Sequence, residues 1–65
     1  MNKEEWPELV SRSSEDAVEQ IGRDRPGVDI VVVRDGDMVT ADFRQDRVRV
    51  FVSPDRKVTR PPRVG

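Results

Sequence analysis

The segment that decides the fold is Gly36-Asp37-Met38-Val39-Thr40-Ala41-Asp42-Phe43-Arg44-Gln45-Asp46. It joins two runs that have the composition of β-strands, residues 28–33 and residues 47–52. A connection this long without a regular pattern of its own is unusual in a small domain, and such loops are usually functional or disordered. The centre of the segment carries valine, threonine and phenylalanine rather than the Gly and Ser of a flexible linker. We therefore expect a domain that holds this segment away from its body in one shape.

The composition excludes most catalytic sites. The chain has 65 residues and contains neither cysteine nor histidine. Disulfides, thiolate metal sites and Ser-His-Asp or Cys-His catalysis are therefore absent, together with the usual general base at neutral pH. Carboxylate catalysis remains open, but so short a chain has little room for a substrate pocket of roughly 300–1,000 Å³. We expect no enzymatic activity, no cofactor and no bound metal.

The charge is distributed unevenly along the chain. Residues 1–42 hold 5 basic and 11 acidic side chains, whereas residues 43–65 hold 7 basic and 2 acidic side chains, and the net charge is −1. One interpretation is that the two halves complement each other within the folded protein. The other is that the basic half presents a patch to an anionic partner.

No segment of the sequence suggests a membrane or a targeting role. No apolar run approaches the ~20 residues that a transmembrane helix requires. The first five residues, Met-Asn-Lys-Glu-Glu, are not those of a signal peptide. We expect no membrane partner and a monomer, and the compartment is unknown.

One short amphipathic helix is expected in the first half of the chain. Ser13 can cap its free amide groups, and Glu15 and Asp16 suit the positive end of the helix dipole. The helix should end at residues 24–27, because Pro26 disfavours helical geometry at Arg25. Its apolar side is expected to comprise Ala17, Val18 and Ile21, with Val10 just before the helix.

Two main strands and a single tryptophan complete the expected core. Residues 28–33 form a nearly continuous apolar run, which predicts a strand covered on one face by the helix. Residues 47–52 alternate, so that three valines share one face. Trp6 is expected to be a packing anchor rather than an exposed recognition residue. Residues 57–59 are expected to form a short edge strand, and residues 60–65 an extended tail in which two prolines lack ladder donors.

These elements predict an α+β fold. The connection between the two main strands is long enough to cross over, so the strands are expected to be parallel, with one helix packed on a small mixed sheet. We see no internal repeat, so residues 1–65 are expected to form a single domain.

Two pairs of residues suggest how the long connection is held. Thr40 and Asp42 lie near its centre, while Arg47 and Arg49 share the face of the following strand opposite the valines. If the connection folds back, the two guanidinium groups lie beneath Thr40 and Asp42, and arginine offers five donors in a rigid fork. The alternative is that both arginines are solvated residues, whose exposed ion pairs are worth only ~0–1 kcal/mol.

The loop and the strand that follows it resemble those of a known family. Residues 39–52 closely resemble the reactive loop and supporting strand of the potato inhibitor I family of serine protease inhibitors. The opening residues 5–10, the serine-capped helix ending in Asp24-Arg25-Pro26 and the closing Pro62-Arg63-Val64-Gly65 match the same family. The resemblance covers nearly the whole chain, with the motifs in the right order and at the right separations.

The resemblance implies a protease-binding loop with a scissile bond at Ala41–Asp42. Ala41 would enter the primary specificity pocket of a subtilisin-like, elastase-like or chymotrypsin-like enzyme. Arg47 and Arg49 would support the loop from below. The remaining protease contacts would be made by Met38, Val39 and Thr40 on the non-primed side, and by Asp42, Phe43 and Arg44 on the primed side.

A non-inhibitory binding module remains the alternative. It would use the basic second half of the chain to bind nucleic acid or a protein. Against nucleic acid stand the acidic overall balance and the scarcity of aromatic residues for base stacking, which are Trp6, Phe43 and Phe51. The basic residues concerned are Arg44, Arg47, Arg49, Arg56, Lys57, Arg60 and Arg63.

Overall fold

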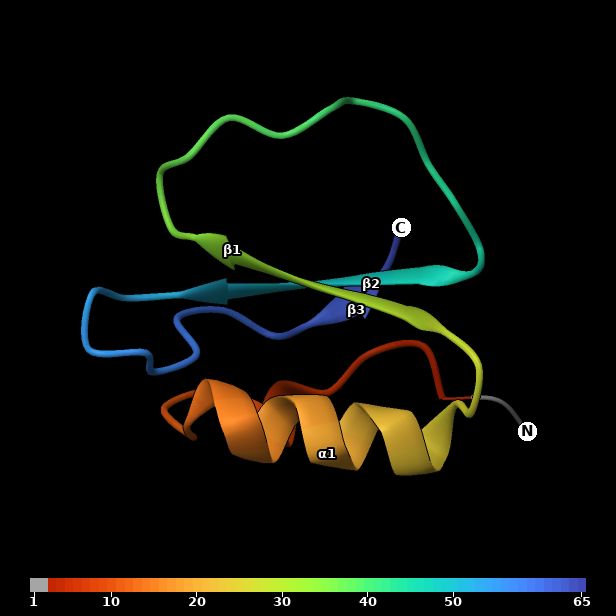
Figure 1. Ribbon diagram of the computed structural model, residues 1–65, viewed down its shortest axis with the longest axis horizontal. Coiled ribbons are helices and arrows are strands. Elements are labelled where there is room, and N and C mark those ends of the chain that lie inside the picture. Colours follow the sequence, from red (N-terminus) through yellow and green to blue (C-terminus); the bar gives the residue numbers. More distant parts are fainter. Residues whose placement is uncertain (1–2) are drawn as a thin grey trace.

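The computed structural model describes residues 3–65 as one α-helix on a three-stranded mixed sheet. Residues 1 and 2, to which part of the signal-peptide expectation applies, lie outside the described residues. Helix α1 covers one side of the sheet, and the segment between β1 and β2 arches away on the other side (Figure 1). The elements are η1 (Pro7–Leu9), α1 (Ser14–Asp24), β1 (Asp29–Arg34), β2 (Arg47–Val52) and β3 (Arg63–Val64).

The predicted parallel pairing of the two main strands is confirmed. The sheet order is β1-β2-β3, and β1 pairs with β2 in parallel from Asp29 opposite Arg47 to Arg34 opposite Val52. Parallel strands need a crossover between them, and here that crossover is the long connection instead of a helix. We call residues 35–46 the connecting loop. Strand β3 pairs antiparallel to β2 on the other side, with Val48 opposite Val64.

The core lies between α1 and the inner face of β2. The three valines of β2 are buried as their alternation predicted, and Trp6 is fully buried as the expected anchor. The indole N–H of Trp6 donates a hydrogen bond of 2.8 Å to the Asp24 carboxylate, which satisfies its one polar group. The buried apolar side chains are Trp6, Leu9, Ala17, Ile21, Val48, Val50, Val52 and Val58.

Helix α1 begins and ends where the sequence indicated. The Ser13 hydroxyl accepts a hydrogen bond of 3.1 Å from the Asp16 amide, so Ser13 is the N-cap. The helix ends at Asp24, one residue before Arg25 and the proline that follows it. It spans 11 residues, and no helix within residues 3–65 is long and apolar enough to cross a membrane.

The expected apolar side of the helix was partly wrong. Ala17 and Ile21 are buried, but Val10 and Val18 are each 37% exposed. Residues four apart on a helix lie on the same face, whereas Val18 is turned about 100° from Ala17 and reaches the edge of the contact. Leu9, delivered by the short helix η1, fills the space instead.

The first strand packs against the core on one face, as expected, but this cover does not extend along its whole length. Val31 is 39% exposed and Val32 is 47% exposed, whereas Val28, Ile30 and Val33 are partly buried. Strand β1 is at the edge of the sheet, whereas β2 is in the middle and carries the buried valines. The apolar run therefore supplies strand propensity more than it supplies core.

The last strand lies later in the chain than expected. Residues 57–59 make only isolated bridges, such as that between Val52 and Val58, instead of a strand. The predicted extended tail instead provides strand β3 after its two prolines. The Pro62 carbonyl accepts a hydrogen bond of 2.9 Å from the Trp6 amide, so a proline contributes as an acceptor where it cannot donate.

Candidate functional site

The connecting loop is exposed along its whole length. Every residue from 35 to 46 is exposed, and Met38 reaches 98% and Phe43 68%. The loop forms an open arch on the side of the sheet away from α1 (Figure 1). Exposed apolar side chains concentrated on one segment of a small domain are typical of an interaction site.

Arg47 binds the centre of the arch from below. Its guanidinium donates to the Asp42 carbonyl at 3.0 Å and to the Asp42 carboxylate at 3.3 Å, and its Nε donates to the Gly65 carbonyl at 2.8 Å. Arg47 is only 7% exposed, although it is charged. A buried guanidinium with all its acceptors in place fixes the backbone at Asp42 to the start of β2 and to the end of β3.

Arg49 binds the other side of the same turn. Its Nη2 donates to the Thr40 hydroxyl at 2.6 Å and lies 3.5 Å from the Asp42 carboxylate. The Thr40 hydroxyl in turn donates to that carboxylate. Thr40, Asp42, Arg47 and Arg49 therefore form one network around Ala41, which lies between Thr40 and Asp42.

The network lowers the pKa of the Asp42 carboxyl from 3.8 to about 2, because the Thr40 hydroxyl and then the Arg47 guanidinium donate to its charged form. A lowered pKa means that the contacts persist above pH 4 and are lost as the pH falls towards 2.

We predict that Thr40→Val raises the pKa of Asp42 towards its ordinary value. Side-chain carboxyl NMR during a pH titration measures it, with Asp55 as an internal reference. An unchanged Asp42 pKa in Thr40→Val would contradict the prediction.

The space beneath residues 41–43 is hollow, so this part of the loop is not held by packing on the sheet. A cavity of about 340 Å³ opens between the loop and the sheet. Its lining comprises Ala41, Asp42, Phe43, Arg49, Phe51, Arg60, Pro61, Arg63, Val64 and Gly65. The polar network, rather than the hydrophobic core, therefore determines the shape of the loop.

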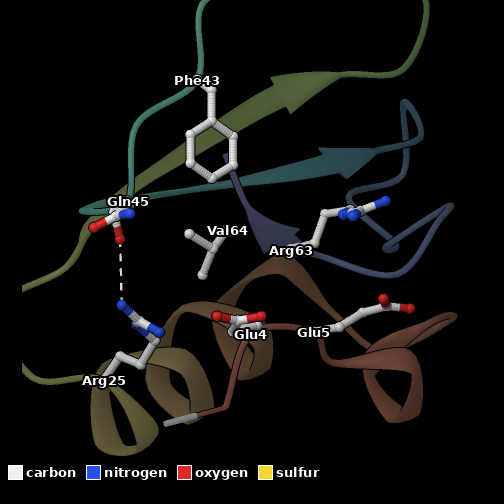
Figure 2. A pocket seen from close by; sticks show the side chains of 7 residues that line it. All are labelled: Glu4, Glu5, Arg25, Phe43, Gln45, Arg63 and Val64. Carbon is white, nitrogen blue, oxygen red and sulfur yellow. Dashed lines mark hydrogen bonds between the residues drawn. The ribbon is translucent and has the colours of Figure 1, made fainter.

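Contacts that the sequence did not reveal hold the two ends of the loop. At the exit, Arg25 at the end of α1 donates 3.2 Å bonds to the Gln45 carbonyl and to the Lys3 carbonyl. Figure 2 shows the first of these bonds beside a second hollow, which Phe43 and Val64 also line. At the entrance, Arg60 donates 2.6 Å to the Asp35 carboxylate. No local spacing signals these pairs, because their members are 20 to 25 residues apart.

The residues expected to contact a protease differ in how far their side chains are available to a partner. Met38, Val39 and Phe43 are exposed, and Ala41 lies at the top of the network. Arg44 instead turns to the base of the loop, where it donates to Asp46 at 3.0 and 3.1 Å and lies 4.0 Å from Asp29.

Within residues 3–65, no group of three or more carboxylates is placed to hold a metal ion.

Comparison with known proteins gives the class of this fold and site. The model of the potato inhibitor I family matches residues 1–65. The chain is 48% identical over 63 residues to subtilisin inhibitor CLSI-I of Canavalia lineata, covering 97% of this chain and 95% of that protein. It is 49% identical over 63 residues to the Glu S. griseus protease inhibitor of Momordica charantia, covering 97% and 93%.

A solved structure that is similar to this protein supports the same family as the sequence comparisons. The crystal structure of bitter gourd trypsin inhibitor superposes with a TM-score of 0.95 at 42% identity, over 100% of this chain and 96% of that one. These proteins are inhibitors rather than enzymes. The chain belongs to the potato inhibitor I family of serine protease inhibitors.

Proposed function

We propose that this protein inhibits serine proteases by presenting residues 38–44 to the active site as a substrate-like strand, with the Ala41–Asp42 bond at the catalytic serine. The observation that carries the proposal is the arginine network on either side of that bond. Arg49 binds Thr40, before the bond, and Arg47 binds Asp42, after it. Neither end created by cleavage is free to leave.

The arrangement favours tight binding. A protease binds extended peptides partly through main-chain pairing, and an ordinary peptide must first be ordered, at roughly 0.5–1.5 kcal/mol per immobilised side chain. A loop already held by Arg47 and Arg49 avoids much of this loss. We expect an interface near ~1,600 Å² in which a few loop residues supply most of the energy.

The fold also favours rejoining of the bond over its hydrolysis. The core includes Trp6 and Ile21 from before Ala41, and Val48 and Val50 from after Asp42. Strand β1 precedes the bond in the chain and β2 follows it. The two strands pair along their whole length. After cleavage the two pieces would stay together, and Arg47 would keep the new amino group of Asp42 beside the acyl-enzyme.

The size of Ala41 sets the expected targets. A methyl side chain suits small primary pockets, and an absent larger apolar group costs on the order of 1–3 kcal/mol in a deep one. Relatives of this chain include a subtilisin inhibitor of Phaseolus angularis and an inhibitor of trypsin and Hageman factor of Cucurbita maxima, so members of the family differ in their targets. We therefore assign subtilisin-like and elastase-like proteases as the preferred partners of this protein.

An inhibition panel tests this function directly. We predict strong inhibition of subtilisin and elastase, weaker inhibition of chymotrypsin and the weakest inhibition of trypsin. Inhibition constants would be measured at matched substrate saturation, followed by mass analysis for a single nick after Ala41. Nanomolar inhibition of trypsin without an effect on subtilisin or elastase would contradict the assignment.

The basic half of the chain gives less support to nucleic-acid binding. Its arginines are largely neutralised within the molecule, since Arg44 pairs with Asp46, Arg47 with Asp42 and Arg60 with Asp35. Phosphate contacts would have to displace these carboxylates. A salt-dependent mobility shift with DNA or RNA would restore this alternative.

A further inference from the structure

The outer face of β2 carries a row of side chains directed to the loop side of the sheet. Arg47, Arg49 and Phe51 alternate with the buried valines and so share one face. The first two donate to Asp42 and Thr40, which are successive points of the loop read towards its entrance. The third member of the row is aromatic and has no hydrogen-bond donor to offer.

Arg60 places its guanidinium over Phe51, the third residue of this row. Its central carbon lies 4.1 Å from the centre of the Phe51 ring, which is the geometry of a cation–π contact. The amide and the hydroxyl of Thr59 both donate to the Phe51 carbonyl, at 2.9 and 3.2 Å. These bonds fix the backbone next to Arg60, and Pro61 restricts it on the other side.

From this position Arg60 binds the entrance of the loop. Its Nη2 lies 2.6 Å from the Asp35 carboxylate, and this hydrogen bond lowers the pKa of that carboxyl. Asp35 is the first residue after β1, and its amide donates to the Val52 carbonyl at 2.8 Å. Gly36 follows with a φ of +99°, so the chain turns sharply here. Fixing Asp35 therefore fixes the direction in which the loop leaves the sheet.

We propose that Arg60, stacked on Phe51 and bonded to Asp35, is a third positioning residue of the loop, which holds the non-primed stem as Arg47 and Arg49 hold the centre. This contact is important because residues 36–39 are all exposed, so no buried side chain of their own anchors the stem. The inference deepens the proposed inhibitory function and rests on it for its role in protease binding.

The test compares Arg60→Ala and Asp35→Asn with a matched control, Arg23→Ala. Arg23 is also an exposed arginine paired with one carboxylate, that of Glu19, but it lies on α1 away from the loop. In the free protein, the amides at positions 35 and 37 donate to the Val52 and Arg34 carbonyls, and their exchange should quicken about three- to tenfold in both loop variants, while that of residues 47–52 stays unchanged. Cleavage at Ala41–Asp42 by subtilisin should accelerate by a similar factor.

Two further variants separate positioning from general stability. Arg60→Lys keeps the charge but loses the planar fork, so it should restore part of the slow exchange. The double variant Arg60→Ala/Asp35→Asn should behave like Arg60→Ala alone, because Asp35 has already lost its partner in that variant. Equal acceleration at positions 35 and 37 and in residues 47–52, or the same response in Arg23→Ala, would overturn the proposal.

The outcome is independent of the proposed function. If the wild-type protein inhibited no protease, the inhibitory function would fail, but amide exchange in the free protein would still decide whether Arg60 orders the stem. If the wild-type protein inhibits and Arg60→Ala leaves both exchange and cleavage unchanged, the inhibitory function stands and Arg60 is not a positioning residue.

Discussion

Replacing Arg47 by alanine is expected to convert the protein from an inhibitor into a substrate. The change removes both bonds to Asp42 and the bond to the Gly65 carbonyl. Hydrogen bonds to charged groups are worth about 1.5–3 kcal/mol, so inhibition should weaken roughly 10- to 100-fold. The protein should be cut at Ala41–Asp42 during an assay in which the wild-type chain stays intact.

The comparison needs variants that separate charge from geometry. Arg47→Lys retains a charge but cannot reach three acceptors as a fork, so it should recover only part of the inhibition. Arg49→Ala should have a smaller effect, because it loses one bond to Thr40 and a looser contact with Asp42. Arg23→Ala serves as the unaffected control. Unchanged inhibition constants with no cleavage in Arg47→Ala would refute the support role.

Enlarging the side chain at position 41 is expected to change the preferred protease. Ala41→Leu adds three carbons where the family resemblance places the primary pocket, and filling that pocket supplies about 1–3 kcal/mol. Inhibition of chymotrypsin should therefore tighten roughly 10- to 100-fold, while inhibition of elastase weakens. The wild-type and variant inhibition constants on both enzymes measure the switch.

A matched control for this change is available on the helix. Val18→Leu also enlarges an exposed apolar side chain, at a position 37% exposed and away from the loop, and should alter neither constant. If Ala41→Leu left both enzymes unaffected, the bond presented to the protease would lie elsewhere in the loop. Mass analysis of slowly formed products would then identify it.

The elements that the sequence predicted are those fixed by local chemistry. The alternation of residues 47–52 was enough to predict the buried valines of β2, and Ser13 before an apolar-periodic stretch was enough to predict the cap of α1. The length of the loop indicated the parallel crossover, because no short connection can join parallel strands.

The details that escaped prediction depend on tertiary position. An apolar run does not say whether its strand will be central or at an edge, and β1 is at an edge with Val31 and Val32 exposed. In the site, Arg47 and Arg49 are close in sequence to their partners, so spacing suggested the contacts. Arg25 and Arg60 are brought to the loop only by the fold, so no spacing could indicate them.

The position of Trp6 has a spectroscopic consequence. It is the single tryptophan of the chain, fully buried on the α1 side of the sheet with its indole N–H bound to Asp24. Its fluorescence emission therefore reports the integrity of the core and is insensitive to events in the exposed arch. Cleavage of one loop bond should leave the Trp6 emission unchanged, whereas unfolding should shift it. A single fluorescence measurement can therefore distinguish a variant that has been cleaved from one that has unfolded.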